Sequence, residues 1–148
     1  MWPLAELLPH AGNMILLDRI EHYDDETIVA YLTVRDGCLF SQADGSYPAY
    51  LGVELMAQAI AAYAGLKARH AGEPVRLGFL LGTRKYESNV SRFPLGSELR
   101  VSAKRSLEDD SGMGVFECEL TSDDIQVCAR LNVYRPNNVT SYIQETPP

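Results

Sequence analysis

An apolar run between positions 48 and 67 constrains the fold more than any other part of this 148-residue chain. Pro48 suits a first helical turn, the interior is rich in Ala, Leu and Met, and basic residues with Gly72 follow the run. The pattern predicts a helix of about 20 residues, roughly 30 Å long. Apolar side chains occur nearly all round this helix, so we expect it to be buried.

Alternating apolar and polar residues predict strands on both sides of the helix. The predicted strands cover residues 14–20, 27–34, 98–106, 115–120 and 125–133, and residues 3–8 are predicted to form a short opening helix. Turn-forming residues at 108–112 and 122–124 join the last three strands into hairpins. One buried helix and several antiparallel strands predict an α+β fold in which a curved sheet wraps around the helix.

The length fits one domain, which we place at residues 1–135, and residues 136–148 are predicted to form a loosely organised tail. With 46% hydrophobic and 22% charged residues the composition is typical of a soluble globular protein. Cys38, Cys118 and Cys128 have no C-x-x-C spacing and no two histidines have ligand spacing, which favours neither a disulfide framework nor a metal site. We expect a cytoplasmic protein without an export signal or a membrane segment.

The charge of the chain is uneven. Thirteen basic and twenty acidic residues give a net charge of -7, which argues against a protein that binds nucleic acid. Residues 67–105, however, hold nine of the basic residues and three acidic ones, a local charge of +6. This segment is either a basic face for an acidic partner or an ordinary solvated strand surface, and the residues alone favour the second interpretation.

Glu54 is an acidic residue within the apolar helix, and Gln58 follows it by one turn on the same face. A buried carboxylate is costly unless it is paired, and such groups concentrate at sites of proton transfer. The alternative is that Glu54 reaches solvent near the helix N-terminus, where the helix dipole favours an acid. His10 is predicted to lie on a loop that enters a strand. The chain contains neither a serine-hydrolase elbow nor a Walker loop.

Three segments together resemble one family. They are Leu8-Pro9-His10 with Met14-Ile15-Leu16-Leu17-Asp18-Arg19, Pro48 followed by Glu54-Leu55-Met56-Ala57-Gln58, and Pro94-Leu95-Gly96-Ser97-Glu98-Leu99. They are similar to motifs of the hotdog-fold 3-hydroxyacyl-[acyl-carrier-protein] dehydratases, and the branch they resemble most is the ApeP-like dehydratases of aryl-polyene biosynthesis. The resemblance extends over about residues 4–134.

The resemblance implies a hotdog fold whose subunits pair their sheets and form active sites at the interface. The implied assembly is a homodimer or higher homo-oligomer, or a heterodimer with a related hotdog subunit. The implied reaction converts 3-hydroxyacyl thioesters to trans-2-enoyl thioesters in fatty-acid or polyene-type biosynthesis. The substrate would be carried on the phosphopantetheine of an acidic acyl carrier protein, and no other cofactor is implied.

The resemblance implies a catalytic carboxylate at Glu54, and we consider His10 as the second catalytic residue by hypothesis only. The other expected site residues are substrate-binding residues and basic residues for carrier docking. They are Gln58, Pro48, Ala49, Tyr50 and Met14, then Arg84 and Lys85.

The chain departs from the family in front of the helix. A Gly-His-Phe-Pro segment is replaced by residues 39–47, which contain no histidine, and Ala49 replaces a glycine. His10 either supplies the missing imidazole and works with Glu54, or is a structural turn residue. Two further functions remain open: a hotdog acyl thioesterase in which Glu54 activates water, and a non-catalytic partner subunit of an active hotdog dehydratase.

Overall fold

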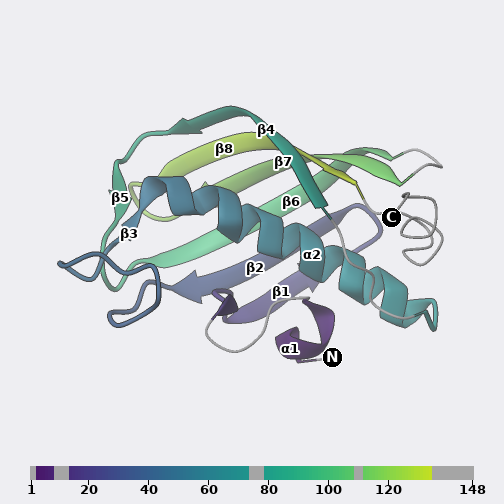
Figure 1. Cartoon of the computed structure of the whole chain (residues 1–148), viewed down its shortest axis with the longest axis horizontal. Coiled ribbons are helices and arrows are strands. Elements are labelled where there is room, and N and C mark those ends of the chain that lie inside the picture. Colours follow the sequence, from purple (N-terminus) through teal and green to yellow (C-terminus); the bar gives the residue numbers. More distant parts are fainter. Residues whose placement is uncertain (1–2, 9–13, 74–78, 109–111, 135–148) are drawn as a thin grey trace, which may run out of the picture.

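A computed structural model describes residues 3–8, 14–73, 79–108 and 112–134. Its main feature is a six-stranded antiparallel sheet with the strand order β1-β2-β6-β7-β8-β4 (Figure 1). The strands are β1 (Arg19–Tyr23), β2 (Thr27–Thr33), β4 (Phe79–Ser88), β6 (Glu98–Glu108), β7 (Met113–Thr121) and β8 (Gln126–Tyr134). A second, two-stranded sheet joins β3 (Tyr47–Pro48) to β5 (Arg92–Phe93).

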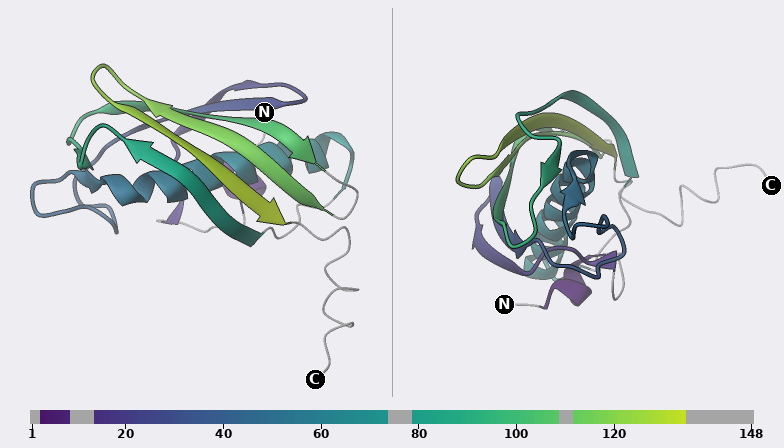
Figure 2. Two further views of the ribbon diagram at one scale, coloured as in Figure 1. Left: turned by 90° about the horizontal axis from the view of Figure 1, so that it is seen from above. Right: turned by 90° about the vertical axis from the view of Figure 1, so that its left-hand side faces the viewer.

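A long helix fills the inside of the curved sheet. The 3-10 turn η2 (Ala49–Leu51) leads directly into α2 (Gly52–His70), and the end-on view shows the sheet curling around it (Figure 2). The predicted α+β arrangement of a sheet around a buried helix is therefore confirmed. The predicted tail at residues 136–148 lies outside the described residues.

The core explains why the alternating segments become strands. Ala30, Val101, Leu120 and Val127 are cross-strand partners on four neighbouring strands, and all four are buried. Side chains with this period of two cover one face of the sheet, and that face meets the buried side of α2. The other face carries the polar members of the same strands.

The helix is apolar because most of it is covered by protein. By length and composition residues 49–70 could cross a membrane, but 72% of the relevant window is buried inside the fold. The short helix α1 (Leu4–Leu7) packs at Gly65, where an added Cβ would overlap the backbone of Leu7. Gly65 therefore sets how closely α1 approaches α2.

Two sequence predictions about strands need correction. Residues 14–18 do not form a strand, because Leu16 donates its backbone N–H to a side chain of α2 instead of a sheet neighbour. The alternating pattern of apolar and polar residues did not predict β4. In this strand the register with β8 shifts between Leu80 and Gly82 and again between Arg84 and Glu87. Each irregularity breaks the period of two on which the strand prediction depends.

Candidate active site

Gln58 forms the centre of the candidate site. Its side chain is fully buried, and its Nε2 donates hydrogen bonds to the carbonyl of Met14 at 2.7 Å and to Oε1 of Glu54 at 3.1 Å. Its Oε1 accepts the backbone N–H of Leu16 at 2.9 Å. The predicted common face of Glu54 and Gln58 is thus a direct side-chain contact, which also reaches the N-terminal segment.

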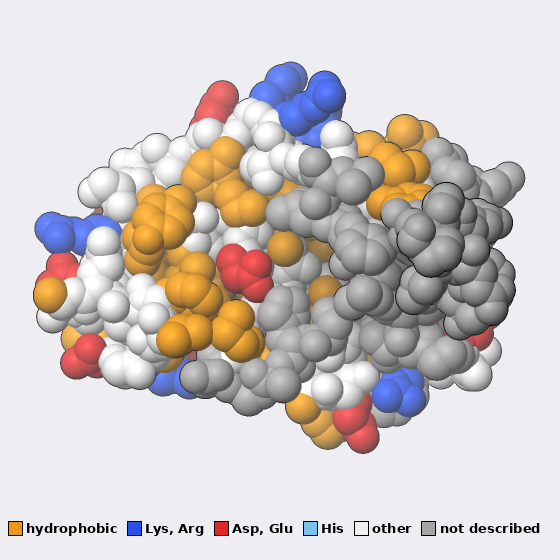
Figure 3. Space-filling view, in the orientation of Figure 1, with side chains coloured by type: hydrophobic (Ala, Val, Ile, Leu, Met, Phe, Trp, Pro, Cys, Tyr) orange, Lys and Arg blue, Asp and Glu red, His pale blue; other side chains and the backbone are white. Residues whose placement is uncertain are grey.

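Glu54 lies in the first turn of α2 and is partly buried. Its Oε1 accepts a hydrogen bond from the Gln58 amide, which fixes the orientation of the carboxyl group. Seen from the side of α2, hydrophobic side chains surround an acidic group over the N-terminal half of the helix (Figure 3). A half-buried carboxylate with a fixed donor beside apolar surface is suited to proton transfer at a bound substrate.

The start of the helix is held by contacts from β4 and from Ser91, the residue before β5. Ala49 donates its N–H to the carbonyl of Ser91 at 3.1 Å, and its own carbonyl accepts hydrogen bonds from the Tyr86 hydroxyl and the Gly52 N–H. Burial raises the pKa of the Tyr86 phenol, so this group stays protonated and donates at neutral pH. Sequence reasoning missed Tyr86, because no local pattern indicates a contact across 37 residues.

The predicted substrate-binding residues differ in exposure. Pro48 is buried and Ala49 partly buried, whereas Tyr50 is 77% exposed and Met14 is 36% exposed. Tyr50 lies one turn before Glu54, and the Met14 carbonyl bonds Gln58, so both residues present large side chains to solvent close to these site residues in the chain or in the network. Gln58 faces the interior, where three groups of the protein occupy its amide.

The positions of the histidines limit which residue could place an imidazole beside Glu54. His22 lies on β1 with its ring bonded to Asp24 at 2.9 Å, and the ring of His70 stacks on Tyr23 at the C-terminal end of α2. Sixteen helical positions separate His70 from Glu54, about 24 Å along the helix. Neither of these two rings serves Glu54 within one chain. His10, the third histidine, lies outside the described residues.

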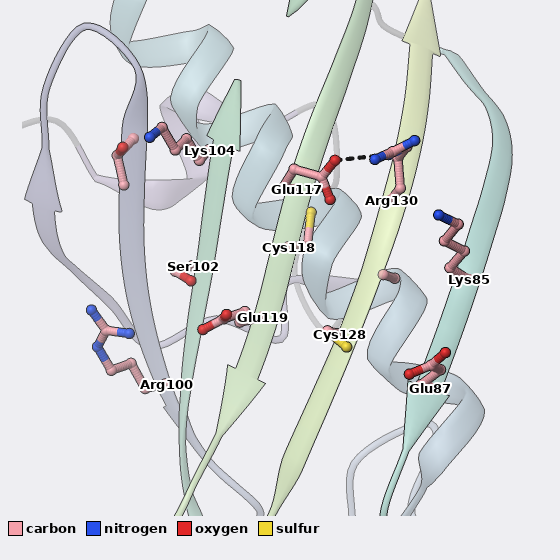
Figure 4. A pocket seen from close by; sticks show the side chains of 12 residues that line it. Lys85, Glu87, Arg100, Ser102, Lys104, Glu117, Cys118, Glu119, Cys128 and Arg130 are labelled. Carbon is pink, nitrogen blue, oxygen red and sulfur yellow. Dashed lines mark hydrogen bonds and ion pairs between the residues drawn. The ribbon is translucent and has the colours of Figure 1, made fainter. Parts of the chain in front are cut away.

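The predicted docking residues lie on the opposite face of the sheet. Arg84 and Lys85 are exposed on β4, and Lys85 has a left-handed backbone with φ of 55° at the second register shift. The close-up of the outer face shows Lys85 beside Arg130, with α2 behind the sheet (Figure 4). Arg84 is the cross-strand partner of Arg130, so three cations gather there, and Glu117 pairs with Arg130 at 2.7 Å.

In the part of the chain that the structure describes, no group of three or more His, Cys, Asp or Glu side chains could hold a metal ion. Burial raises the pKa of the Cys118 thiol to about 12, so this cysteine is a neutral core residue at physiological pH.

The geometry can be compared with known proteins. A family model described as ApeP dehydratase, ApeP-like, matches residues 2–144. The chain belongs to the ApeP-like dehydratase family. A chain of the dehydratase heterocomplex ApeI:P from Xenorhabdus doucetiae is 35% identical, with a TM-score of 0.88 and 97% of each chain covered. The resemblance seen in the sequence motifs is confirmed.

More distant structures share the hotdog fold alone. The smu.793 protein of Streptococcus mutans, bound to acetyl CoA, is 11% identical with a TM-score of 0.63, over 86% of this chain and 94% of that chain. The E. coli PaaI protein of the phenylacetic acid degradation operon is 15% identical with a TM-score of 0.57, over 78% and 81% of the two chains. None of the curated proteins compared with the ApeP-like chain matches it.

Proposed function

We propose that this ApeP-like chain is one subunit of a hotdog dehydratase that converts 3-hydroxyacyl thioesters to trans-2-enoyl thioesters. The observation that carries the proposal is the Glu54 carboxylate, held by a buried amide in the first turn of the central helix. Membership of the ApeP dehydratase family supports the reaction class. The substrate is carried on the phosphopantetheine of an acyl carrier protein in the cytoplasm.

The reaction needs a base and an acid. A base takes the C2 proton, the C2 electron pair forms the new double bond to C3, and the C3–O bond breaks. The hydroxyl then leaves as water after it receives a proton. Glu54 performs one of these proton transfers and an imidazole performs the other. Because the ring of His22 is bonded to Asp24 and His70 lies at the other end of α2 from Glu54, we assign this imidazole to His10 or to a second subunit.

The second subunit is a related hotdog protein. The supporting observation is that a relative 35% identical to this chain occurs in the ApeI:P dehydratase heterocomplex. In such a pair the chain contributes Glu54 and the apolar surface at Tyr50 and Met14. A non-catalytic role in the same complex is the second candidate, and it is favoured by the absence of histidine from residues 39–47 before the helix.

The test follows the conjugated double bond of crotonyl and longer enoyl thioesters as water adds to it. The wild-type chain, the Glu54→Gln variant and the His10→Ala variant are each assayed alone and after mixing with a related hotdog subunit. We expect Glu54→Gln to abolish hydration while folding and assembly persist. Loss of activity in His10→Ala assigns the imidazole to this chain, and full activity assigns it to the partner.

Two results would contradict the dehydratase proposal. Full activity of the mixture with Glu54→Gln would make the chain a non-catalytic subunit. Release of free thiol from an acyl thioester without an enoyl product would select the thioesterase alternative.

A further inference from the structure

The Gln58 amide has one orientation that fits its surroundings. Its Oε1 faces the Leu16 N–H, and its Nε2 faces two acceptors, the Met14 carbonyl and the Glu54 carboxylate. The opposite orientation would place Oε1 2.7 Å from a carbonyl oxygen and 3.1 Å from a carboxylate oxygen, without a donor between them. The acceptors therefore determine which way the amide points.

The donors of this amide are fully used inside the protein. A side-chain amide has two N–H groups, and Gln58 directs one to Met14 and the other to Glu54. The side chain is also fully buried, so a substrate has no access to it. The resemblance suggests a substrate-binding residue at this position, but the contacts assign Gln58 a different role.

The network joins segments far apart in the sequence. Gln58 is 42 residues from Leu16 and 44 from Met14, and Met14 follows directly on residues 9–13, which include His10. One side chain thus holds both the carboxylate and the backbone of the N-terminal segment. Rotation of the amide would break all three hydrogen bonds together, and each is costly to lose in a buried place.

We infer that Gln58 is a positioning residue, which orients the Glu54 carboxylate and anchors residues 14–16 to the same point on α2. The inference rests on the proposed function for its catalytic consequence. Its structural content, a coupling between Gln58, Glu54 and the N-terminal segment, is measured without turnover. The first experiments therefore use folding and hydrogen exchange, and only the last one uses activity.

The coupling to Glu54 is tested by Gln58→Glu, which keeps the side-chain shape and replaces the donating nitrogen with oxygen. At pH 8 the introduced carboxylate faces Glu54 and the Met14 carbonyl, whereas at pH 5 a proton shared by the two carboxyl groups restores a donor. We expect the loss in Tm to be about 4 °C larger at pH 8 than at pH 5. Adding Glu54→Gln should reduce this difference by the part that comes from the contact between the two carboxyl groups.

A residue that only fills space would behave otherwise. The loss in Tm caused by Gln58→Glu would then differ between pH 5 and pH 8 by the same amount with and without Glu54→Gln, because only the general cost of burying a charge would contribute, and that result would overturn the inference. The double-mutant cycle uses the wild type, the two single variants and the double variant at each pH. Only their comparison separates the contact between positions 54 and 58 from the general cost of burying a charge.

The anchor to the N-terminal segment is tested by Gln58→Met, which keeps a similar length without polar atoms. We expect the Leu16 amide to exchange its hydrogen at least about 10-fold faster in this variant. The Thr33 amide is the matched control, because it donates to the Asp18 carboxylate at 2.8 Å and does not contact Gln58. An unchanged exchange rate at Leu16, or an equal acceleration at both amides, would overturn the anchor.

The catalytic consequence is tested in the active complex. We expect Gln58→Met to lower kcat by roughly 10- to 100-fold while KM stays within about threefold, because misplaced proton transfer affects the chemical step. An unchanged kcat in an otherwise active complex would overturn the positioning role. If the wild-type complex has no dehydratase activity, the proposed function fails, while the Tm cycle and the exchange rates still decide whether Gln58 couples the three groups.

Discussion

The hydroxyl of Tyr86 donates a hydrogen bond to the carbonyl of Ala49, and this contact lies against the first residue of α2, Gly52. A Cβ built on Gly52 would overlap the Tyr86 hydroxyl and lie 3.3 Å from Cζ of the ring. Edge strand β4 therefore holds the start of the helix that carries Glu54, and glycine is the residue that permits the close approach.

Gly52→Ala is expected to destabilise the protein by about 1–3 kcal/mol, because Tyr86 must move and its hydrogen bond to Ala49 is lost. The measurement is urea unfolding of Gly52→Ala, Tyr86→Phe and the double variant. In the Tyr86→Phe background the clashing oxygen is gone, so the added cost of Gly52→Ala should fall by about 1 kcal/mol or more. Equal costs in both backgrounds would show that the two residues do not meet.

Lys85 has a left-handed backbone, with φ of 55°, and it directly precedes Tyr86. This conformation costs a residue with a Cβ roughly 1 kcal/mol, and glycine avoids the cost. Lys85→Gly should therefore be about 1 kcal/mol more stable than Lys85→Ala in chemical unfolding. Both variants remove the same charge, so the difference reports the backbone. An alanine variant as stable as the glycine variant would contradict a left-handed residue at this bulge.

Burial raises the pKa of the Cys118 thiol to about 12, and an unfolded cysteine ionises near pH 8.5. Between these values the folded state keeps a proton that the unfolded state has released, so stability falls as pH rises from about 8.5. Unfolding free energies measured from pH 7 to pH 10 should show this loss. Cys118→Ala should flatten the curve in this range, while its general cavity cost lowers stability equally at every pH. An identical slope in the variant would contradict the raised pKa.

The sequence predicted the parts of the fold that follow a local period. The predicted helix at 48–67 corresponds to η2 and α2, and the strands that begin near residues 27, 98, 115 and 125 were found because their alternation is unbroken. The strand β4 was missed because its register shifts twice. The bulge at Lys85 also reverses part of the alternation that would have revealed Tyr86 as an inward-facing residue.

The candidate site was also predictable only where its contacts are local in the sequence. Glu54 and Gln58 are four residues apart on one helix, and this spacing alone predicts their contact. The contacts from Gln58 to Met14 and Leu16 join residues more than 40 positions apart, and only the packing of the N-terminal segment against α2 brings them together. No local pattern encodes such a contact.

The basic face formed by Arg84, Lys85 and Arg130 is a candidate docking surface for an acidic carrier protein. Arg84→Glu with Lys85→Glu should lower kcat/KM for a carrier-bound substrate by at least about 10-fold and leave a small thioester analogue nearly unaffected. Added salt should reduce the difference, because it screens exposed charges.

The matched control reverses Arg100 and Lys104 on β6, which changes the net charge by the same amount on the same outer face of the sheet (Figure 4). Docking at β4 requires that this control retain most of the carrier-bound activity. If both double variants lose the same activity, the carrier responds to the total charge of the subunit and not to a surface at Arg84 and Lys85. If the small analogue is affected as strongly as the carrier-bound substrate, the substitutions have disturbed the start of α2 through Tyr86, which follows Lys85 directly.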